Sequence, residues 1–167
     1  MGIDTNFETW YRTEHPRLLA ALAVVAGDVE VARDLTAEAF ARALERWDRV
    51  SAMSSPGGWT YRVALNLLRR RARRATLERR LLLRLAPAPG PVALPAPAIE
   101  VWEAVTALPP RMRTALALRY LGGLTEAEVG DAMGITPGTV ASTLHDARRR
   151  LAVLLAPASA TQEVSHG

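Results

Sequence analysis

Apolar residues recur at helical spacing in two blocks of the chain. Their periodicity, with helix start and stop signals between the stripes, predicts helices before and after a central break. The predicted helices span about 5–26, 28–47, 59–84, 99–108 and 111–121, and two more follow. Strand signals are weak, because alternating runs of Val, Ile and Thr between turn residues are rare. The pattern therefore predicts an all-α fold.

A proline-rich stretch separates the two blocks. Residues 85–98 contain five prolines and no charged residue, so they can neither continue a helix nor join a sheet. We interpret this stretch as an extended, semi-rigid Pro/Ala-rich linker. The sequence thus predicts two small helical domains, at 5–84 and 99–155, and a disordered tail at 156–167.

The end of the second block has the signals of two short helices around a tight turn. Thr125 and Glu128 form a capping box, and Gly134 can adopt the positive φ that ends the first helix. Thr136, followed by proline, starts the second helix. Its inward stripe consists of Val140, Leu144, Ala147 and Leu151. This is the pattern of a helix-turn-helix, whose second helix faces the DNA major groove; a plain helical hairpin in an all-α core has the same pattern.

The distribution of charge indicates that the main contact with a polyanion lies outside the helix-turn-helix. Residues 60–84 carry nine arginines and one acid, whereas 1–59 carry six arginines and nine acids, and 99–155 carry six of each. A clustered excess of cations is the electrostatic footprint of a nucleic-acid-binding protein. The sequence therefore predicts that the helix at 59–84, rather than the helix-turn-helix, makes the stronger contact. The Leu/Arg pattern at 77–85 would also suit a helix on a membrane surface.

Several classes of protein do not fit this sequence. The chain has no cysteine, which excludes disulfides, thiolate metal sites and a cysteine nucleophile. Its longest wholly apolar run, nine residues at 18–26, is too short to span a bilayer. The N-terminus lacks the pattern of a signal peptide, the three histidines are scattered, and no phosphate loop appears. We expect a cytoplasmic, non-catalytic protein without cofactor, metal, membrane insertion or small-molecule substrate.

Three segments, in chain order, resemble one family. Segment 28–47 is similar to region 2.2 of the group IV, or extracytoplasmic-function (ECF), sigma factors of bacterial RNA polymerase, which belong to the sigma-70 family. Segment 56–74 resembles the promoter-reading helix of these proteins, and 108–151 resembles their region 4. The resemblance implies a region 2 helical bundle and a region 4 helix-turn-helix. It also implies a subunit that binds core polymerase, recognises a promoter and helps to open it.

One face of the segment at 28–47 is the implied contact with the clamp helices of the polymerase β′ subunit. Asp34 and Glu38 lie one helical turn apart, close to apolar anchors. A solvated acidic face would have the same pattern. The implied contact residues are Asp34, Leu35, Glu38, Phe40 and Leu44. Ala37 stands where the family usually has Gln, so we expect one polar contact fewer.

Promoter opening needs cations for phosphates, flat rings for unstacked bases and a pocket for a flipped base. Trp59 and Tyr61 can stack on bases or pack in the core, and Asn66 can donate to and accept from a base edge. The resemblance implies that the loop at 54–58 receives a flipped base of the −10 element. The expected −10 residues are Ser54, Ser55, Trp59, Tyr61, Arg62, Asn66, Arg69, Arg70 and Arg73.

The second helix of the helix-turn-helix departs from the family pattern. The family commonly has basic residues at the positions of Ala141, Thr143 and Asp146. Losing cations weakens binding to DNA of any sequence, and an acid near phosphate adds repulsion. We therefore expect a weak or unusual −35 preference. The expected −35 residues are Thr136, Thr139, Ala141, Ser142, Thr143, His145, Asp146 and Arg149.

The resemblance also implies partners. The apolar side of 111–121 would receive the polymerase β flap, although it could instead pack on 99–108, and an anti-sigma factor would bury the polymerase-binding faces. The linker would thread the polymerase cleft, but it lacks the acids that family linkers tend to carry. Two other functions remain open: a stand-alone dimeric helix-turn-helix regulator, and a sigma-like interaction protein with weak DNA binding.

Overall fold

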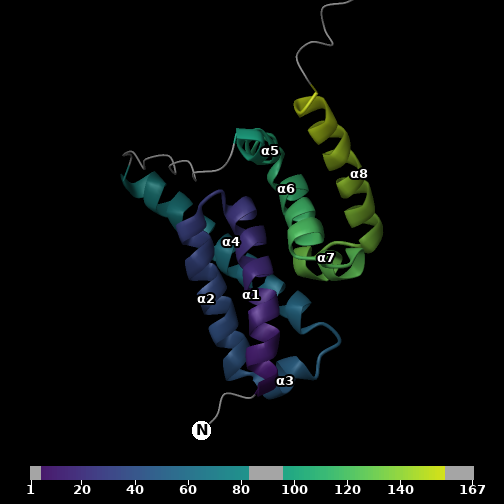
Figure 1. Cartoon of the computed structure of the whole chain (residues 1–167). Helices are drawn as coiled ribbons and strands as arrows, with labels where there is room; N and C mark the ends of the chain where they lie inside the picture. The colour runs from purple at the N-terminus through teal and green to yellow at the C-terminus, as the bar shows by residue number, and fades with distance from the viewer. Residues whose placement is uncertain (1–4, 83–95, 157–167) are drawn as a thin grey trace, which may run out of the picture.

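The computed structural model describes residues 5–82 and 96–156, and within these ranges the regular structure is entirely helical (Figure 1). The elements are α1 (Thr5–Ala26), α2 (Val29–Glu45), α3 (Trp47–Ser51), α4 (Pro56–Leu82), α5 (Ala96–Thr106), α6 (Pro110–Leu116), a π-helical turn η1 (Ala117–Leu121), α7 (Glu126–Met133) and α8 (Pro137–Leu154). The predicted all-α fold is confirmed. The predicted linker up to residue 95, and the predicted tail from 157, lie outside the described residues.

Helix ends follow local signals in the sequence. Gly27 ends α1 with a φ of +69°, and the Asp28 side chain accepts from the backbone N–H groups of Glu30 and Val31 at 2.8 and 3.1 Å. These bonds satisfy donors that have no partner within α2. The capping box of α7 is present, and Gly134 ends that helix in the left-handed conformation. All of these ends agree with the predictions.

Three boundaries differ from the prediction. The expected loop at 48–58 contains α3, and α4 begins at Pro56 rather than Trp59. The reason is that Ser55 caps α4, accepting from Gly58 N–H at 3.0 Å, and proline suits the first helical position. α5 begins at Ala96, inside the predicted linker.

The predicted continuous helix at 111–121 divides into α6 and η1. At the end of η1 the N–H of Gly122 donates to the carbonyl of Ala117 at 3.0 Å, five residues back. A Cβ on Gly122 would lie 2.6 Å from the carbonyl oxygen of Leu118 and 2.8 Å from the hydroxyl oxygen of Tyr61. The wide turn therefore depends on a residue without a side chain.

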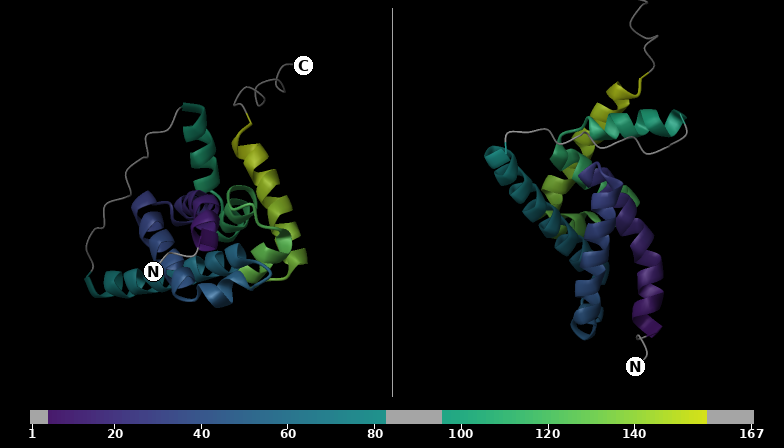
Figure 2. Two further views of the ribbon diagram at one scale, coloured as in Figure 1. Left: turned by 60° about the horizontal axis from the view of Figure 1, so that its bottom comes forward. Right: turned by 90° about the vertical axis from the view of Figure 1, so that its left-hand side faces the viewer.

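The helices form two units that pack against each other. α1, α2, α3 and α4 make the N-terminal unit, and α5, α6, η1, α7 and α8 make the C-terminal unit (Figures 1 and 2). α4 contacts α7, and α1 contacts α6 and η1. Buried residues of both units, such as Leu22 and Leu118, belong to one hydrophobic cluster. The two blocks seen in the sequence therefore share a core. Among the described residues, no helix has the length and apolar character needed to cross a membrane.

Candidate nucleic-acid interface

The arginines gather on α4. Six of them have exposed side chains: Arg62, Arg69, Arg70, Arg71, Arg73 and Arg74. Arg71 pairs with Asp34 of α2, N to O 3.5 Å, and Arg69 donates to the Asn66 side chain at 3.2 Å. Since the helix carries these side chains on several of its sides, it presents a broad cationic surface that suits a nucleic-acid backbone.

A small cavity lies beside the start of α4. Its volume is about 120 Å³, and its walls are Arg46, Arg49, Val50, Met53 and Trp59. Typical small-molecule sites measure roughly 300–1,000 Å³, so this cavity suits a single unstacked base better than a larger ligand. The two arginines are candidates that the sequence reasoning missed. The sequence signal for them was two cations shortly before the loop at 54–58. The net negative charge of residues 1–59 as a whole obscured this signal.

The expected −10 residues divide between surface and core. Ser54, Arg62, Asn66, Arg70 and Arg73 are exposed. Trp59 is half-buried as a wall of the cavity. Tyr61 is only 1% exposed, and its hydroxyl has no hydrogen-bond partner among the described residues. Burial raises the pKa of this hydroxyl well above its usual range. In this structure Tyr61 therefore packs in the core, and its ring is not available for stacking on a base.

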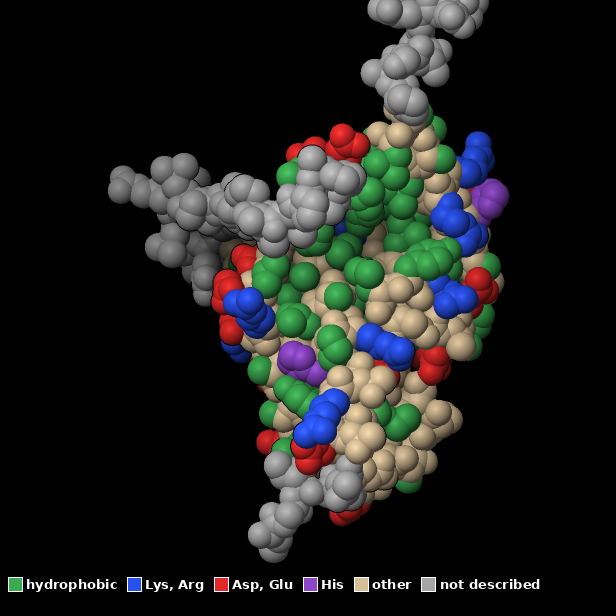
Figure 3. All heavy atoms as spheres, in the orientation of Figure 1, with side chains coloured by type: hydrophobic (Ala, Val, Ile, Leu, Met, Phe, Trp, Pro, Cys, Tyr) green, Lys and Arg blue, Asp and Glu red, His purple; other side chains and the backbone are tan. Residues whose placement is uncertain are grey.

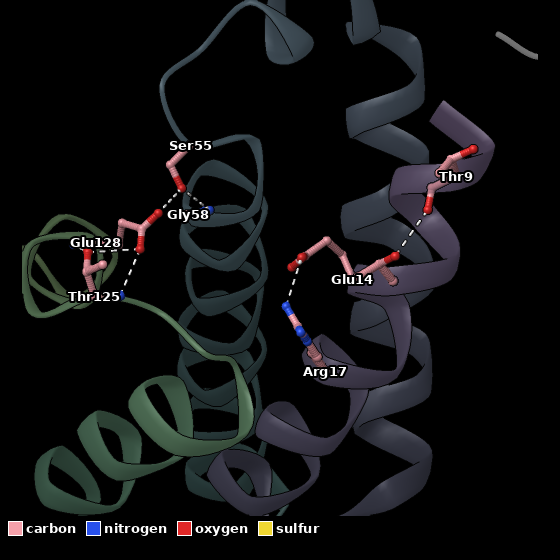
Figure 4. A network of polar contacts seen from close by, with 8 residues as sticks. Thr9, Glu14, Arg17, Ser55, Gly58, Thr125 and Glu128 are labelled. Atoms are coloured by element: carbon pink, nitrogen blue, oxygen red, sulfur yellow. Dashed lines mark hydrogen bonds and ion pairs between the residues drawn. The ribbon is translucent and has the colours of Figure 1, made fainter. Parts of the chain in front are cut away.

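The remaining two −10 candidates contact the C-terminal unit. The Ser55 hydroxyl donates to the Glu128 carboxylate of α7, and Arg69 donates to the Met133 carbonyl at 3.4 Å. Figure 4 shows Ser55, Gly58, Thr125 and Glu128 converging between α4 and α7. The loop that the resemblance assigns to a flipped base is therefore in contact with the helix-turn-helix.

The expected core-polymerase residues lie on both sides of α2. Asp34 and Glu38 are exposed, and Leu44 is 45% exposed. Leu35 and Phe40 are 4% and 3% exposed, so in this conformation they support the helix from inside. Two further acids share the outward side: the acidic face of α2 consists of Glu30, Asp34, Glu38 and Glu45, all exposed. Their helical spacing was the signal for the two added residues.

The second helix of the helix-turn-helix, α8, presents a nearly neutral outer face. The hydroxyls of Ser142 and Thr143 both donate to the carbonyl of Thr139, at 3.0 and 2.7 Å. The hydroxyls of Thr136 and Thr139 lie 2.8 Å apart and share a hydrogen bond.

Charged groups add little to this face. Asp146 is exposed, as are His145 and Arg149, and Ala141 is half-buried. Arg148 donates to the hydroxyl of Tyr120 at 2.8 Å. The polar groups nearest the helix start are therefore engaged within α8, and the cations lie towards its end.

The fold and this interface define a DNA-binding protein with an arginine-rich helix and a helix-turn-helix. The family model for Sigma-70 region 2 matches residues 10–78, and the model for Sigma-70, region 4 matches residues 98–151; together they cover well over half of the chain. The chain therefore belongs to the sigma-70 family of RNA polymerase sigma factors, in its ECF group.

Known proteins agree with this assignment. The RNA polymerase sigma-E factor of Streptomyces coelicolor is 29% identical over 153 residues, which cover 90% of this chain and 86% of that protein. The ECF RNA polymerase sigma factor SigW of Bacillus subtilis is 28% identical over 141 residues, covering 75% of each chain. The fold resembles that of the sigma factor RpoE of Bartonella quintana, solved in complex with the anti-sigma factor NepR. The TM-score is 0.77 at 21% identity, covering 90% of this chain and 96% of that one.

Proposed function

We propose that this sigma factor divides its task in transcription initiation among three surfaces. The acidic face of α2 binds core polymerase, α4 with its adjoining cavity binds the melted −10 strand, and α8 binds −35 duplex weakly. Region 2 then corresponds to residues 5–84 and region 4 to 99–155. This sigma factor supplies binding rather than catalysis, and we infer that it works in the cytoplasm, where RNA polymerase is found.

The observation that carries the −10 assignment is the position of the cavity at the start of the basic helix. Phosphates of a single strand can lie along the exposed arginines of α4, such as Arg70 and Arg73, while one unstacked base enters the cavity beside Trp59. Stacking on an aromatic ring is worth about 1–3 kcal/mol per base. Arg46 and Arg49 would face the inserted base and contribute hydrogen-bond donors.

The −35 contact is proposed to be weak because α8 offers few cations to duplex DNA. Its hydroxyls already bond within the helix, and the exposed carboxylate of Asp146 repels phosphate. Arg149 and Arg150, both exposed, remain for the DNA backbone. Promoter choice would then depend mostly on α4 and on polymerase.

An apolar groove supports the expected anti-sigma partner. It measures about 720 Å³ and is lined by Ala20, Ala23, Val24, Val29, Val101, Trp102, Val105, Leu116, Ala117, Tyr120, Leu121 and Leu151. Figure 3 shows hydrophobic side chains gathered on this side of the molecule. An apolar groove of this kind suits the apolar face of an amphipathic helix.

The groove would exist only while the two units are packed together, because α1 and the start of α2 supply one side and α5, α6, η1 and α8 supply the other. An anti-sigma helix bound there would hold the units together. In the polymerase-bound protein, the exposed apolar side chains of Tyr120 and Leu121 would contact the β flap instead.

Co-purification with core polymerase tests the α2 assignment. We expect Asp34→Arg together with Glu38→Arg to abolish co-purification and run-off transcription, because opposite charge replaces two exposed carboxylates. Reversal of Glu8, an exposed acid of α1 outside the acidic face, is the control and should leave both activities intact. Undiminished co-purification of the double variant would exclude this face as the polymerase contact.

A further inference from the structure

Thr76 lies in the arginine-rich half of α4, in a sequence pattern that no other serine or threonine of the chain shares. Arg73 and Arg74 stand three and two residues before it, and the apolar Leu77 follows it directly. Protein kinases that select arginine at these positions bind the guanidinium groups with acidic side chains of their substrate groove. The pattern therefore marks Thr76 as a candidate acceptor of a phosphoryl group.

The part of α4 that carries Thr76 is accessible to a second protein. Every residue from 69 to 77 is exposed except Ala75, which is half-buried. Figure 2 shows this end of α4, in teal, extending beyond the neighbouring helices. Its ion pair to α2, between Arg71 and Asp34, is exposed and contributes little to stability. A kinase that needs its substrate extended can therefore unwind this end of the helix at the loss of few contacts.

Thr76 also continues the row of side chains assigned to the −10 strand. Arg62, Asn66, Arg69 and Arg73 recur at intervals of three or four residues, and Thr76 occupies the next position of the same row. This spacing places the row along one side of α4. All five residues are exposed. A charge added at Thr76 would therefore lie one helical turn from Arg73, at the end of the DNA-binding row.

We propose that Thr76 is a phosphorylation site and that its phosphate weakens binding of the −10 strand. The effect on DNA rests on the assignment of α4 to that strand, whereas the acceptor site does not. The Thr76 hydroxyl oxygen forms a bond to the γ-phosphorus of ATP, the bond from that phosphorus to the β–γ bridging oxygen breaks, and ADP leaves. The hydroxyl proton passes to the catalytic base of the kinase. In α4 this hydroxyl donates to the carbonyl of Ala72 at 2.9 Å, so unwinding of the helix also frees the nucleophile.

A phosphate at this position opposes DNA binding in two ways. It carries a charge of about −1.5 to −2 at neutral pH and three acceptor oxygens. The guanidinium group of Arg73, one turn earlier on the same side, can donate to these oxygens and is then not free for DNA. The remaining negative charge repels the DNA backbone. Loss of about two cationic contacts lowers the affinity for a single strand roughly tenfold to thirtyfold in about 0.1 M salt.

Phosphoryl transfer tests the acceptor site directly. The full chain is incubated with Mg²⁺, ATP and the catalytic subunit of cAMP-dependent protein kinase, which selects arginines at the same two positions, and is then analysed by tandem mass spectrometry. We expect phosphate on Thr76 and none at position 76 of Thr76→Val. Arg74→Gln should slow the transfer at least about tenfold, because one of the two selected arginines is lost.

A second incubation replaces the purified kinase with an ATP-supplemented extract of the cells from which the chain comes, and the same residue should be modified. Thr114 is the internal comparison. Arg111 stands three residues before it but Met112 stands two before it, and its half-buried side chain donates to the carbonyl of Pro110 at 2.8 Å. Absence of phosphate from Thr76 in either incubation, or transfer to Thr114 at an equal rate, would overturn the proposal.

The consequence for DNA is measured with a fluorescein-labelled pool of short, random-sequence DNA single strands, followed by anisotropy. We expect the phosphorylated chain to bind roughly tenfold to thirtyfold more weakly than the mock-treated chain, with a slope of log affinity against log salt that is smaller by about 1.4. Phosphatase treatment should restore the binding. Equal binding with and without phosphate would overturn the inhibitory role.

A pair of variants gives the same comparison without a kinase. Thr76→Glu adds one negative charge, and Thr76→Gln is its neutral control of the same size. We expect the glutamate variant to bind the pool roughly threefold to fivefold more weakly than the glutamine variant. Equal affinities of the two variants would contradict the electrostatic argument and overturn the proposal. Failure of the unmodified chain to bind the pool would instead contradict the −10 assignment of α4, and the phosphoryl transfer to Thr76 would still report on the acceptor site.

Discussion

Gly122 is a position where a normally favourable substitution should be harmful. Its φ is −74°, within the helical range, so alanine introduces no backbone strain. Replacing glycine by alanine at such a position usually stabilises a protein by about 0.4–1 kcal/mol, because the unfolded chain loses freedom. Here the new methyl group would lie 2.6 Å from the Leu118 carbonyl oxygen and 2.8 and 2.9 Å from the Oη and Cζ atoms of Tyr61.

The steric cost should exceed the entropic gain. One contact is with backbone of η1 and the other with a ring that is 1% exposed, so neither neighbour can move without disturbing the shared core. Overpacking of this kind costs typically about 1–3 kcal/mol. We therefore expect Gly122→Ala to lower the free energy of unfolding by about 1–2 kcal/mol, a shift of several degrees in Tm.

Urea and thermal unfolding followed by circular dichroism measure this effect. The matched control is Gly138→Ala in the first turn of α8, where a Cβ would have no neighbour within 4 Å; this variant should gain about 0.5 kcal/mol. Tyr61→Phe in the Gly122→Ala background should recover part of the loss, because the ring then lacks the hydroxyl oxygen that lies 2.8 Å from the methyl group. The reasoning is refuted if Gly122→Ala is as stable as Gly138→Ala.

Three further outcomes are expected. Burial and the charge of Glu128 raise the pKa of Glu14 against the opposing effect of Arg17. The ionised carboxylate therefore lowers stability at neutral pH, and Glu14→Gln should raise Tm there. This gain in Tm should shrink towards zero as the pH falls below the ordinary carboxyl range, because Glu14 is then neutral as well. Arg73→Gln should lower the slope of log affinity against log salt for single-stranded DNA by roughly 0.7, whereas exposed Arg33 of α2, changed in the same way, should leave it unchanged. Asp146→Arg should tighten binding of duplex DNA roughly threefold to tenfold and steepen its salt dependence, as measured by anisotropy; an unchanged affinity would show that this part of α8 does not approach DNA.

Elements whose signals lie within a few residues were predictable from the sequence. The capping box of α7, the left-handed Gly134 and the Asp28 cap all depend on neighbours in the chain, and each occurs as expected. The start of α4 was misplaced because Gly57 and Gly58 resemble a loop, although the Ser55 cap and the following proline held the correct signal. The π-helical turn gave no local signal, because its geometry comes from the approach of Gly122 to α4.

The exposure of the candidate site residues could not be predicted from the local sequence either. The helical spacing of Asp34 and Glu38 places them outward, but it cannot tell that Leu35 and Phe40 on the same helix are buried. Exposure depends on which elements pack against α2, and those lie elsewhere in the chain. A pattern that marks residues as belonging to one motif therefore does not place them on one surface.

Glu128 has one partner that the local sequence indicates and one that it does not. Its role in the capping box accounts for one of its two carboxylate oxygens, and nothing near it in sequence indicates a partner for the other. That partner is Ser55, the cap of a distant helix, so the contact arises only because the two units pack together. Within one unit the sequence predicts which surfaces are candidate DNA contacts, whereas their exposure also depends on how the two units pack together. A residue that stabilises the helix-turn-helix thus also contacts the cap of α4 in the other unit.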